Sequence, residues 1–321
     1  MSATRVHSHV AQPRRYEYLG LTVVLVLLVA LFSAVSDHFF SRVTFTTLAN
    51  QVPALTVAAI GLTFVLVAAG IDLSVGSVMA LSAAALGVAV TRWEWAVPVA
   101  IAASLGIGTL AGLLNGVVSV RWRVPSFIVT LGMLEIARGG AYLVTDSRSV
   151  FVGAKLDAVG APLPGIGLSP AILVATLLVA AGQVVLTRTV FGRYLVAIGT
   201  NREAVRLAGI EPGPVEVAVF TLSGVLAGLA GVFHVAYLET ADPNAGIGLE
   251  LSAIAAVVIG GTSLMGGRGS VVSSFLGVLI IAVLQAGLAQ VGASEPAKRI
   301  VTGSVIVAAV VADAYRQRSA L

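Results

Sequence analysis

The chain has 321 residues, of which 58% are hydrophobic and 11% charged, and its formal net charge is +4. Soluble domains carry about a quarter of their residues charged, so this composition excludes an ordinary soluble protein. The apolar runs are long and continuous rather than alternating, which favours membrane-spanning helices over barrel strands. Since there is no cysteine, disulfides, thiolate nucleophiles and cysteine metal sites are also excluded. The net charge lies in loops and ends, so we interpret it as membrane topology rather than affinity for nucleic acid.

Residues 1–16 are predicted to form a polar, cytoplasmic N-terminal tail. Arginines precede the first apolar run, 19–35, as they do in a signal peptide, but this run is long and no A-x-A-type cleavage site follows it. We therefore expect an uncleaved first span. His7 and His9 form an H-x-H pair in this tail, which we interpret as a solvated segment and not as a metal site.

Nine further apolar runs follow the first one. They cover residues 47–70, 73–91, 95–120, 124–145, 168–187, 214–237, 250–266, 270–291 and 298–314. The sequence thus predicts an all-α, polytopic bundle of about ten spans, with a transmembrane domain over 17–316 and a short tail over 317–321. With both termini in the cytoplasm, the inner loops and ends hold twice as many Lys and Arg residues as the outer loops, as the positive-inside rule requires.

The polar segment 188–214 lies between two of these runs and is the largest loop on the predicted cytoplasmic side. Within it, 201–209 is predicted to be one short helix, because Asn201 can cap its N-terminus and Gly209 can end it in a left-handed turn. Pro212 and Pro214 should prevent any continuation. Charged residues fall on one side and apolar residues on the other. Two interpretations stay open: the helix lies on its own membrane domain, or it docks on a partner.

Small residues recur at helical spacing in two of the predicted spans. Spans pack closely through small-xxx-small faces, since no hydrophobic effect drives helices together within lipid. These positions are predicted to be helix-packing sites: Ser104, Gly108, Gly112 and Gly116 in one span, and Gly224 and Gly228 in another.

Ionisable residues within spans are costly and therefore informative. Glu135 and Arg138 are three residues apart, close enough to form a structural ion pair, with contact to a solute as the alternative. Asp72 is expected to cap the helix that follows it, the alternative being a broken helix along a polar path. Asn115 poses the same question. The glycine-rich stretch 260–270 forms a second break of this kind, which raises the possibility of an internal duplication.

Several catalytic motifs are absent from the sequence. There is no Walker A loop, no H-E-x-x-H and no G-x-S-x-G, and the four histidines are scattered, so we predict neither a catalytic nor a metal site. Few acids lie within the spans, which weakens the case for a proton-driven carrier.

Four segments, in order, resemble a known family. They are GIDLSVGSVMALSAA at 70–84, NGVVSVRWRVPSFIVTLGM at 115–133, AIGTNREAVRLAGI at 197–210 and AVVIGGTSLMGGRGSV at 256–271. Together they are similar to the permease subunits of bacterial ribose-type ABC importers, which include xylose, arabinose, galactose and autoinducer-2 permeases. The resemblance extends over about 17–316. Two departures are Glu135, where a neutral residue is expected, and Trp122 in a basic turn.

The resemblance implies a non-catalytic, multi-pass subunit of the bacterial inner membrane that imports a monosaccharide. Its partners would be a second permease chain, a periplasmic or lipid-anchored sugar-binding protein, and a cytoplasmic ATPase that uses ATP and Mg, with no cofactor on this chain. The 188–214 loop would carry the coupling helix, whose predicted contact residues are Asn201, Arg202, Glu203, Ala204, Arg206, Leu207, Gly209 and Ile210. Alternatives are a nucleoside or autoinducer-2 as the solute, or an ion-coupled secondary transporter.

Overall fold

The computed structural model describes residues 15–318, so most of the predicted tail 1–16 and the last three residues lie outside the described part. Among the described residues, helices dominate and two short strands form one antiparallel pair. The main elements are α1 (Arg15–Val35), α2 (Arg42–Gln51), α3 (Pro53–Val67), α4 (Val75–Thr91), α5 (Val97–Trp122), α6 (Ser126–Thr145), β1 (Val150–Phe151), α7 (Asp157–Gly160), α8 (Pro170–Arg188), α9 (Val190–Thr200), α10 (Arg202–Leu207), α11 (Pro212–Leu238), β2 (Thr240–Ala241), α12 (Leu249–Ile259), α13 (Val271–Gln290) and α14 (Glu295–Arg318).

Within the described residues, six helices are long and apolar enough to cross a membrane, namely α1, α5, α6, α8, α11 and α13. A seventh span results if α2 and α3, which meet at a 46° bend, count as one. The bend falls at Pro53, the first residue of α3, where proline needs no backbone donor. The prediction of a helical, multi-span membrane protein is therefore confirmed.

Two of the predicted spans are shorter helices next to irregular segments. The 17-residue α4 follows a break at 68–74, and the 11-residue α12 precedes a glycine-rich loop at 260–270. Positive φ angles at Gly261, Gly266 and Gly267 explain why helix α12 does not continue into α13.

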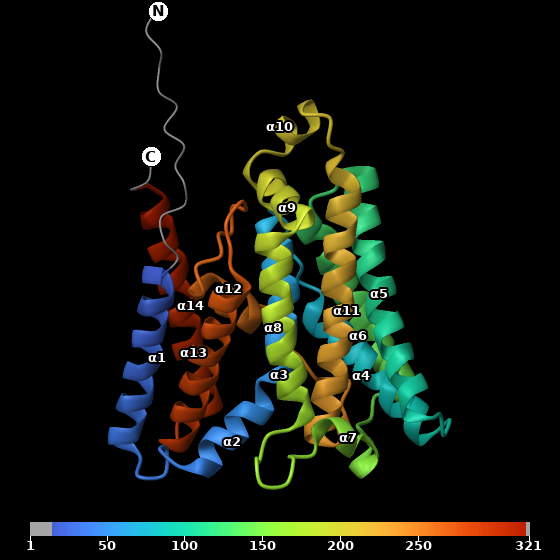
Figure 1. Ribbon diagram of the computed structural model, residues 1–321. Coiled ribbons are helices and arrows are strands. Elements are labelled where there is room, and N and C mark those ends of the chain that lie inside the picture. Colours follow the sequence, from blue (N-terminus) through green and yellow to red (C-terminus); the bar gives the residue numbers. More distant parts are fainter. Residues whose placement is uncertain (1–14, 319–321) are drawn as a thin grey trace, which may run out of the picture.

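The two ends of the bundle differ. Helices α9 and α10 lie at one end, together with the start of α1 and the end of α14 (Figure 1). Helices α2 and α7 lie at the opposite end. We refer to these as the α10 end and the α2 end. The strand pair β1–β2 joins the loop after α6 to the loop after α11.

Helices α5 and α11 pack backbone to backbone at the centre of the fold. A Cβ atom on Gly108 would overlap the carbonyl oxygen of Gly224, and one on Gly112 would overlap that of Phe220. Further along, a Cβ on Gly228 would come within 2.9 Å of the Ser104 carbonyl oxygen. A Cβ atom on Gly116 would likewise come within 2.8 Å of the Val217 Cα atom. The two small-residue faces thus meet each other, and larger residues would force the helices apart.

Candidate functional site

Helix α10 is a short, capped helix within the polar segment. The Asn201 side chain accepts a hydrogen bond from the Ala204 amide at 2.9 Å, and Gly209 adopts φ +81° just beyond the helix. Both ends therefore carry the residues that such ends prefer. Pro212 does more than end this segment, because it is the first residue of α11, a position that suits proline.

Helix α9 forms part of the same segment, although the sequence reasoning singled out only 201–209. Thr189 caps it by accepting a hydrogen bond from the Gly192 amide at 3.2 Å. Leu195 and Ile198 are buried, and the Phe191 ring lies 6.5 Å from that of Phe64 on α3. The spacing of these three α9 residues, i, i+4 and i+7, is the helical signal that could have revealed α9.

The end of α9 lies against both breaks in the bundle. The Gly267 amide, in the 260–270 loop, donates a 2.9 Å hydrogen bond to the carbonyl oxygen of Val67, the last residue of α3. A Cβ atom on Gly199 would overlap that same oxygen. Any displacement of α9 must therefore move the end of α3 and the 260–270 loop as well, since there is no free space between these close-packed backbones.

Helix α10 presents two different faces. Val205 is buried, with 7% of its surface exposed, whereas Leu207 is 80% exposed. Arg206 and Glu203 pair on the outer surface at 2.6 Å. Ala204 and the rest of the helix are exposed as well, and Ile210 is half-buried. The helix thus buries one apolar side chain, Val205, and leaves another, Leu207, uncovered.

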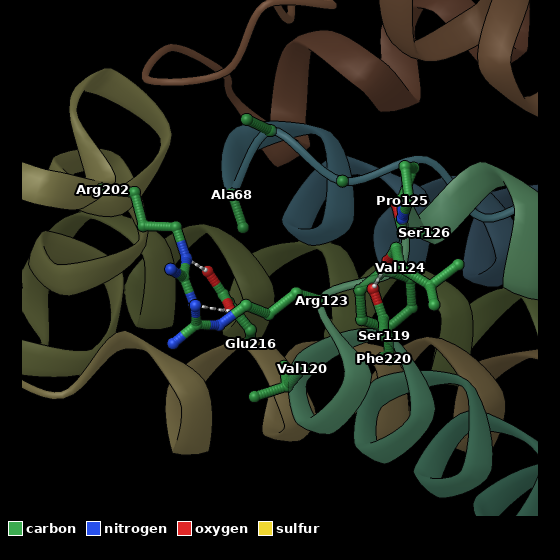
Figure 2. A pocket seen from close by; sticks show the side chains of 12 residues that line it. Ala68, Ser119, Val120, Arg123, Val124, Pro125, Ser126, Arg202, Glu216 and Phe220 are labelled. Carbon is green, nitrogen blue, oxygen red and sulfur yellow. Dashed lines mark hydrogen bonds and ion pairs between the residues drawn. The ribbon is translucent and has the colours of Figure 1, made fainter.

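A pocket of about 320 Å³ lies directly beneath α10 (Figure 2). It lies between the end of α3, the α5–α6 turn and the first turns of α11. Arg202 spans its rim and contacts Glu216 twice, at 2.6 Å from Nε and 3.2 Å from Nη2. The bonds that the Glu216 carboxylate accepts raise the pKa of Arg202 above its ordinary value. The Arg123 side chain extends toward this pair from the α5–α6 turn.

Asp72 lies at the centre of a buried polar network in the 68–74 break. It accepts hydrogen bonds from the Ser74 amide (3.0 Å), the Ser74 hydroxyl (2.6 Å) and the Ser223 hydroxyl on α11 (2.8 Å). The Asn115 amide donates to the Ser74 oxygen at 3.0 Å. The expected helix cap needs correction, since Ser74 occupies the N-cap of α4 and Asp72 lies before it. The network joins the break to α5 and α11.

Glu135 and Arg138 do not form the expected ion pair in the described part of the chain. Arg138 instead donates to the carbonyl oxygens of Pro243 and Ala245, at 2.6 and 2.8 Å, and so holds the loop after β2 against α6. The Glu135 side chain is exposed at the middle of α6. The loop provides Arg138 with two carbonyl acceptors in a fixed geometry, whereas the exposed Glu135 carboxylate can remain solvated.

The fold and this site define a multi-span helical membrane protein with a capped, partly uncovered helix at one end. Residues 44–310 match the family described as "Branched-chain amino acid transport system / permease component", and the chain belongs to that family. Among known proteins it is similar to the ribose import permease protein RbsC of Escherichia coli K12, with 37% identity over 92% of this chain and 93% of that protein.

Two other relatives carry different sugars in their names. The fructose import permease protein FrcC of Rhizobium meliloti is 33% identical over 94% of this chain and 86% of that protein. The L-arabinose ABC transporter permease protein AraH of Azospirillum brasilense is 32% identical over 93% and 88%. No solved structure matches the chain significantly. The resemblance to ribose-type ABC importer permeases that the four motifs predict is confirmed.

Proposed function

We propose that this chain is the translocation subunit of an ABC importer for a monosaccharide, driven by ATP hydrolysis on a separate cytoplasmic subunit. The observation that carries this proposal is Leu207, an exposed apolar side chain on a capped helix whose other side is fastened to the bundle. Such a side chain suits a groove on a partner, with the Arg206–Glu203 pair at the rim of the contact. This chain performs no bond chemistry, and ATP and Mg bind the partner.

The coupling contacts follow from the position of α10. Asn201 and Gly209 hold the ends of the helix, while Ala204, Leu207 and Ile210 provide apolar surface. Arg202 ties the helix to α11 through Glu216. Because α9 lies against the end of α3 and the 260–270 loop, closure of the ATPase would move both breaks together and rock the bundle between outward-open and inward-open states.

The proposed topology has about ten passes, with both termini and the 188–214 loop in the cytoplasm of a bacterium and the domain 17–316 in its inner membrane. It adds α4, α12 and α14 to the six or seven spans of sufficient length. The α10 end then faces the cytoplasm and the α2 end the periplasm. The preponderance of Lys and Arg in loops at the α10 end supports this orientation.

Two further partners follow from the proposal. The loops 145–168 and 238–250, joined by β1–β2, lie at the periplasmic α2 end and are the proposed contacts of a sugar-binding protein. A second permease chain would cover the exposed side of α6, where an unpaired Glu135 at mid-span cannot face lipid without a large cost. We propose that this face borders an aqueous path between the two chains.

Co-purification tests the coupling claim. The tagged chain should be isolated from native membranes together with vanadate-sensitive ATPase activity, and a variant combining Leu207→Asp with Gly209→Pro should lose that activity while inserting normally. Phe151→Asp is the matched control for ATPase co-purification alone, because Phe151 is 73% exposed but lies on β1, at the opposite end from α10. ATPase activity and uptake that persist in the double variant would reject the proposal.

Reconstitution into liposomes distinguishes the proposed ATP-driven importer from an ion-coupled secondary transporter. An ion-coupled carrier should transport sugar in liposomes that contain this chain alone and an ion gradient, whereas the proposed importer should not. If the solute is a nucleoside or autoinducer-2, the ATPase result should be unchanged. Uptake measured with each of these labelled solutes and with monosaccharides would then distinguish them.

A further inference from the structure

A second cavity, separate from the pocket beneath α10, occupies the other half of the bundle. Its volume is about 700 Å³, and it is lined toward the α2 end by α2, α3, α11, α12, α13 and α14. Sites for small molecules commonly have volumes of roughly 300–1,000 Å³. The loop before α12 lines this cavity at 246–248, and Arg138 of α6 contacts the same loop at the Pro243 and Ala245 carbonyl oxygens, while no residue of α6 lines the cavity.

Several uncharged polar side chains line this cavity without a hydrogen-bond partner among the described residues, and three of them lie on α11 and α13. His234 and Tyr237 lie one turn apart on α11, and Gln285 lies on α13. None of the three makes a side-chain hydrogen bond to another described residue. Both helices are long, apolar candidates for membrane spans, and an unsatisfied polar group there costs several kcal/mol if it faces lipid or a dry void. The cavity therefore suits hydrophilic contents.

The chemistry of the lining indicates the kind of solute. An imidazole, a phenol and a carboxamide offer both donors and acceptors, and the rings of Phe233 and Tyr237 provide flat apolar surface. Fully charged side chains are confined to the first turns of α14, where Glu295 pairs with Lys298 beside Arg299. A neutral, polyhydroxylated molecule satisfies the interior groups, whereas an ion would find no opposite charge there.

We propose that this cavity binds a monosaccharide within each permease chain, with His234, Tyr237 and Gln285 hydrogen-bonding its hydroxyl groups, at a site apart from the proposed path along α6. This proposal rests on the proposed function, because it names a site at which the imported sugar contacts the membrane domain. The cavity extends from Leu238 and Gln51 at the α2 end toward Ile306, so it is open to a sugar delivered at the proposed periplasmic side.

The absence of cysteine permits a direct test on the full-length chain. Gln285→Cys and Tyr237→Cys, each in lipid nanodiscs, should react with a small hydrophilic methanethiosulfonate. Val283→Cys is the matched control on α13, because Val283 is 7% exposed and does not line the cavity. D-ribose, D-fructose or L-arabinose should slow the labelling of both cavity positions severalfold, while L-glutamate should not. Monodisperse elution of each variant verifies the fold.

Each other outcome overturns the assignment. No labelling at either position in nanodiscs, or labelling in detergent alone, would mean that the cavity is dry or filled by lipid. Labelling that no sugar slows would mean that it holds only water. The Leu207→Asp variant separates the two proposals, since it should abolish uptake but leave sugar protection of Gln285→Cys unchanged. Protection without any ATPase association would reject the proposed function alone, and ATPase-dependent uptake without protection would reject the cavity alone.

Discussion

Arg202 and Glu216 form a two-point ion pair that fastens the first residue of α10 to the second turn of α11, with N–O distances of 2.6 and 3.2 Å. The parallel geometry restricts rotation as well as distance. Glu216 is 15% exposed at its side chain and Arg202 51%, so the pair is less screened than an ordinary surface pair. It is the direct side-chain link between the exposed helix and a long central span.

Breaking this pair should weaken coupling without unfolding the bundle. We expect Arg202→Ala to loosen α10 by about 1 kcal/mol, or about fivefold in the population of its seated position. Uptake should fall in proportion, and ATP hydrolysis should persist without transport. The measurement is the ratio of sugar imported to ATP hydrolysed in proteoliposomes that contain the complete importer.

Arg92 provides the control for that experiment. It pairs with Asp146 at 2.7 Å across an exposed contact between α4 and the end of α6, far from α10 in sequence and on other helices. Arg92→Ala should leave the transport ratio unchanged. An equal loss in both variants would show that the Arg202 effect is nonspecific. Exchange of charges in Arg202→Glu with Glu216→Arg should restore part of the ratio.

The α5–α11 contact should tolerate no side chain at Gly108. We expect Gly108→Ala to destabilise the protein by about 1–3 kcal/mol, because the added methyl group overlaps the Gly224 carbonyl of a packed backbone. Gly106, two residues earlier on the same helix, has no atom within 4 Å of its would-be Cβ. Gly106→Ala should therefore be neutral or stabilising by up to about 1 kcal/mol, as alanine favours helix. The temperature at which half of each variant stays monodisperse measures the difference.

The Asp72 network should behave as one unit. Ser223→Ala removes one donor and should cost about 1–3 kcal/mol, and Asp72→Ala should cost more because it removes the acceptor of all three bonds. The double variant should cost less than the sum of the two. Ser304→Ala is the control, since Ser304 bonds only to the Ile300 carbonyl on an exposed face. Strict additivity of the Asp72 and Ser223 effects would contradict a shared network.

Glu135 should report whether its face of α6 meets water. In the assembled importer, Glu135→Cys should react with a membrane-impermeant thiol reagent, whereas Ile136→Cys should not. Ile136 is 69% exposed but lies about 100° further round the helix, on a side that we expect to face lipid. Equal reactivity at the two positions would contradict an aqueous path along one face. Lack of reaction at Glu135→Cys would contradict the aqueous path as well.

The helical segments could be predicted closely from the sequence, because hydrophobicity and Gly/Pro signals act locally. The run 124–145 became α6 at Ser126–Thr145, and 214–237 became α11 at Pro212–Leu238. The cap at Asn201 and the left-handed Gly209 likewise depend only on neighbouring backbone. Such features need no knowledge of what packs against them.

Long-range partners could not be predicted in this way. Local spacing predicted a pair between Glu135 and Arg138, but Arg138 bonds to a loop more than 100 residues away. Arg202 pairs with Glu216 on α11, whereas Glu203, its neighbour in sequence, pairs with Arg206. A charged side chain bonds to whichever acceptors the fold brings within reach. Spacing in the sequence reveals only the acceptors on the same helix.

The sequence by itself determined that this protein is a helical membrane protein with a capped polar loop, because composition, span length and helix ends are local properties of the chain, and its four motifs indicated the permease family. Only the tertiary structure decided which faces meet. It set Gly108 against Gly224, enclosed Asp72 between α4 and α11, and left Leu207 uncovered. The reason is physical: inside a membrane, contacts depend on close packing and paired polar groups, and both are fixed by where helices distant in sequence come together.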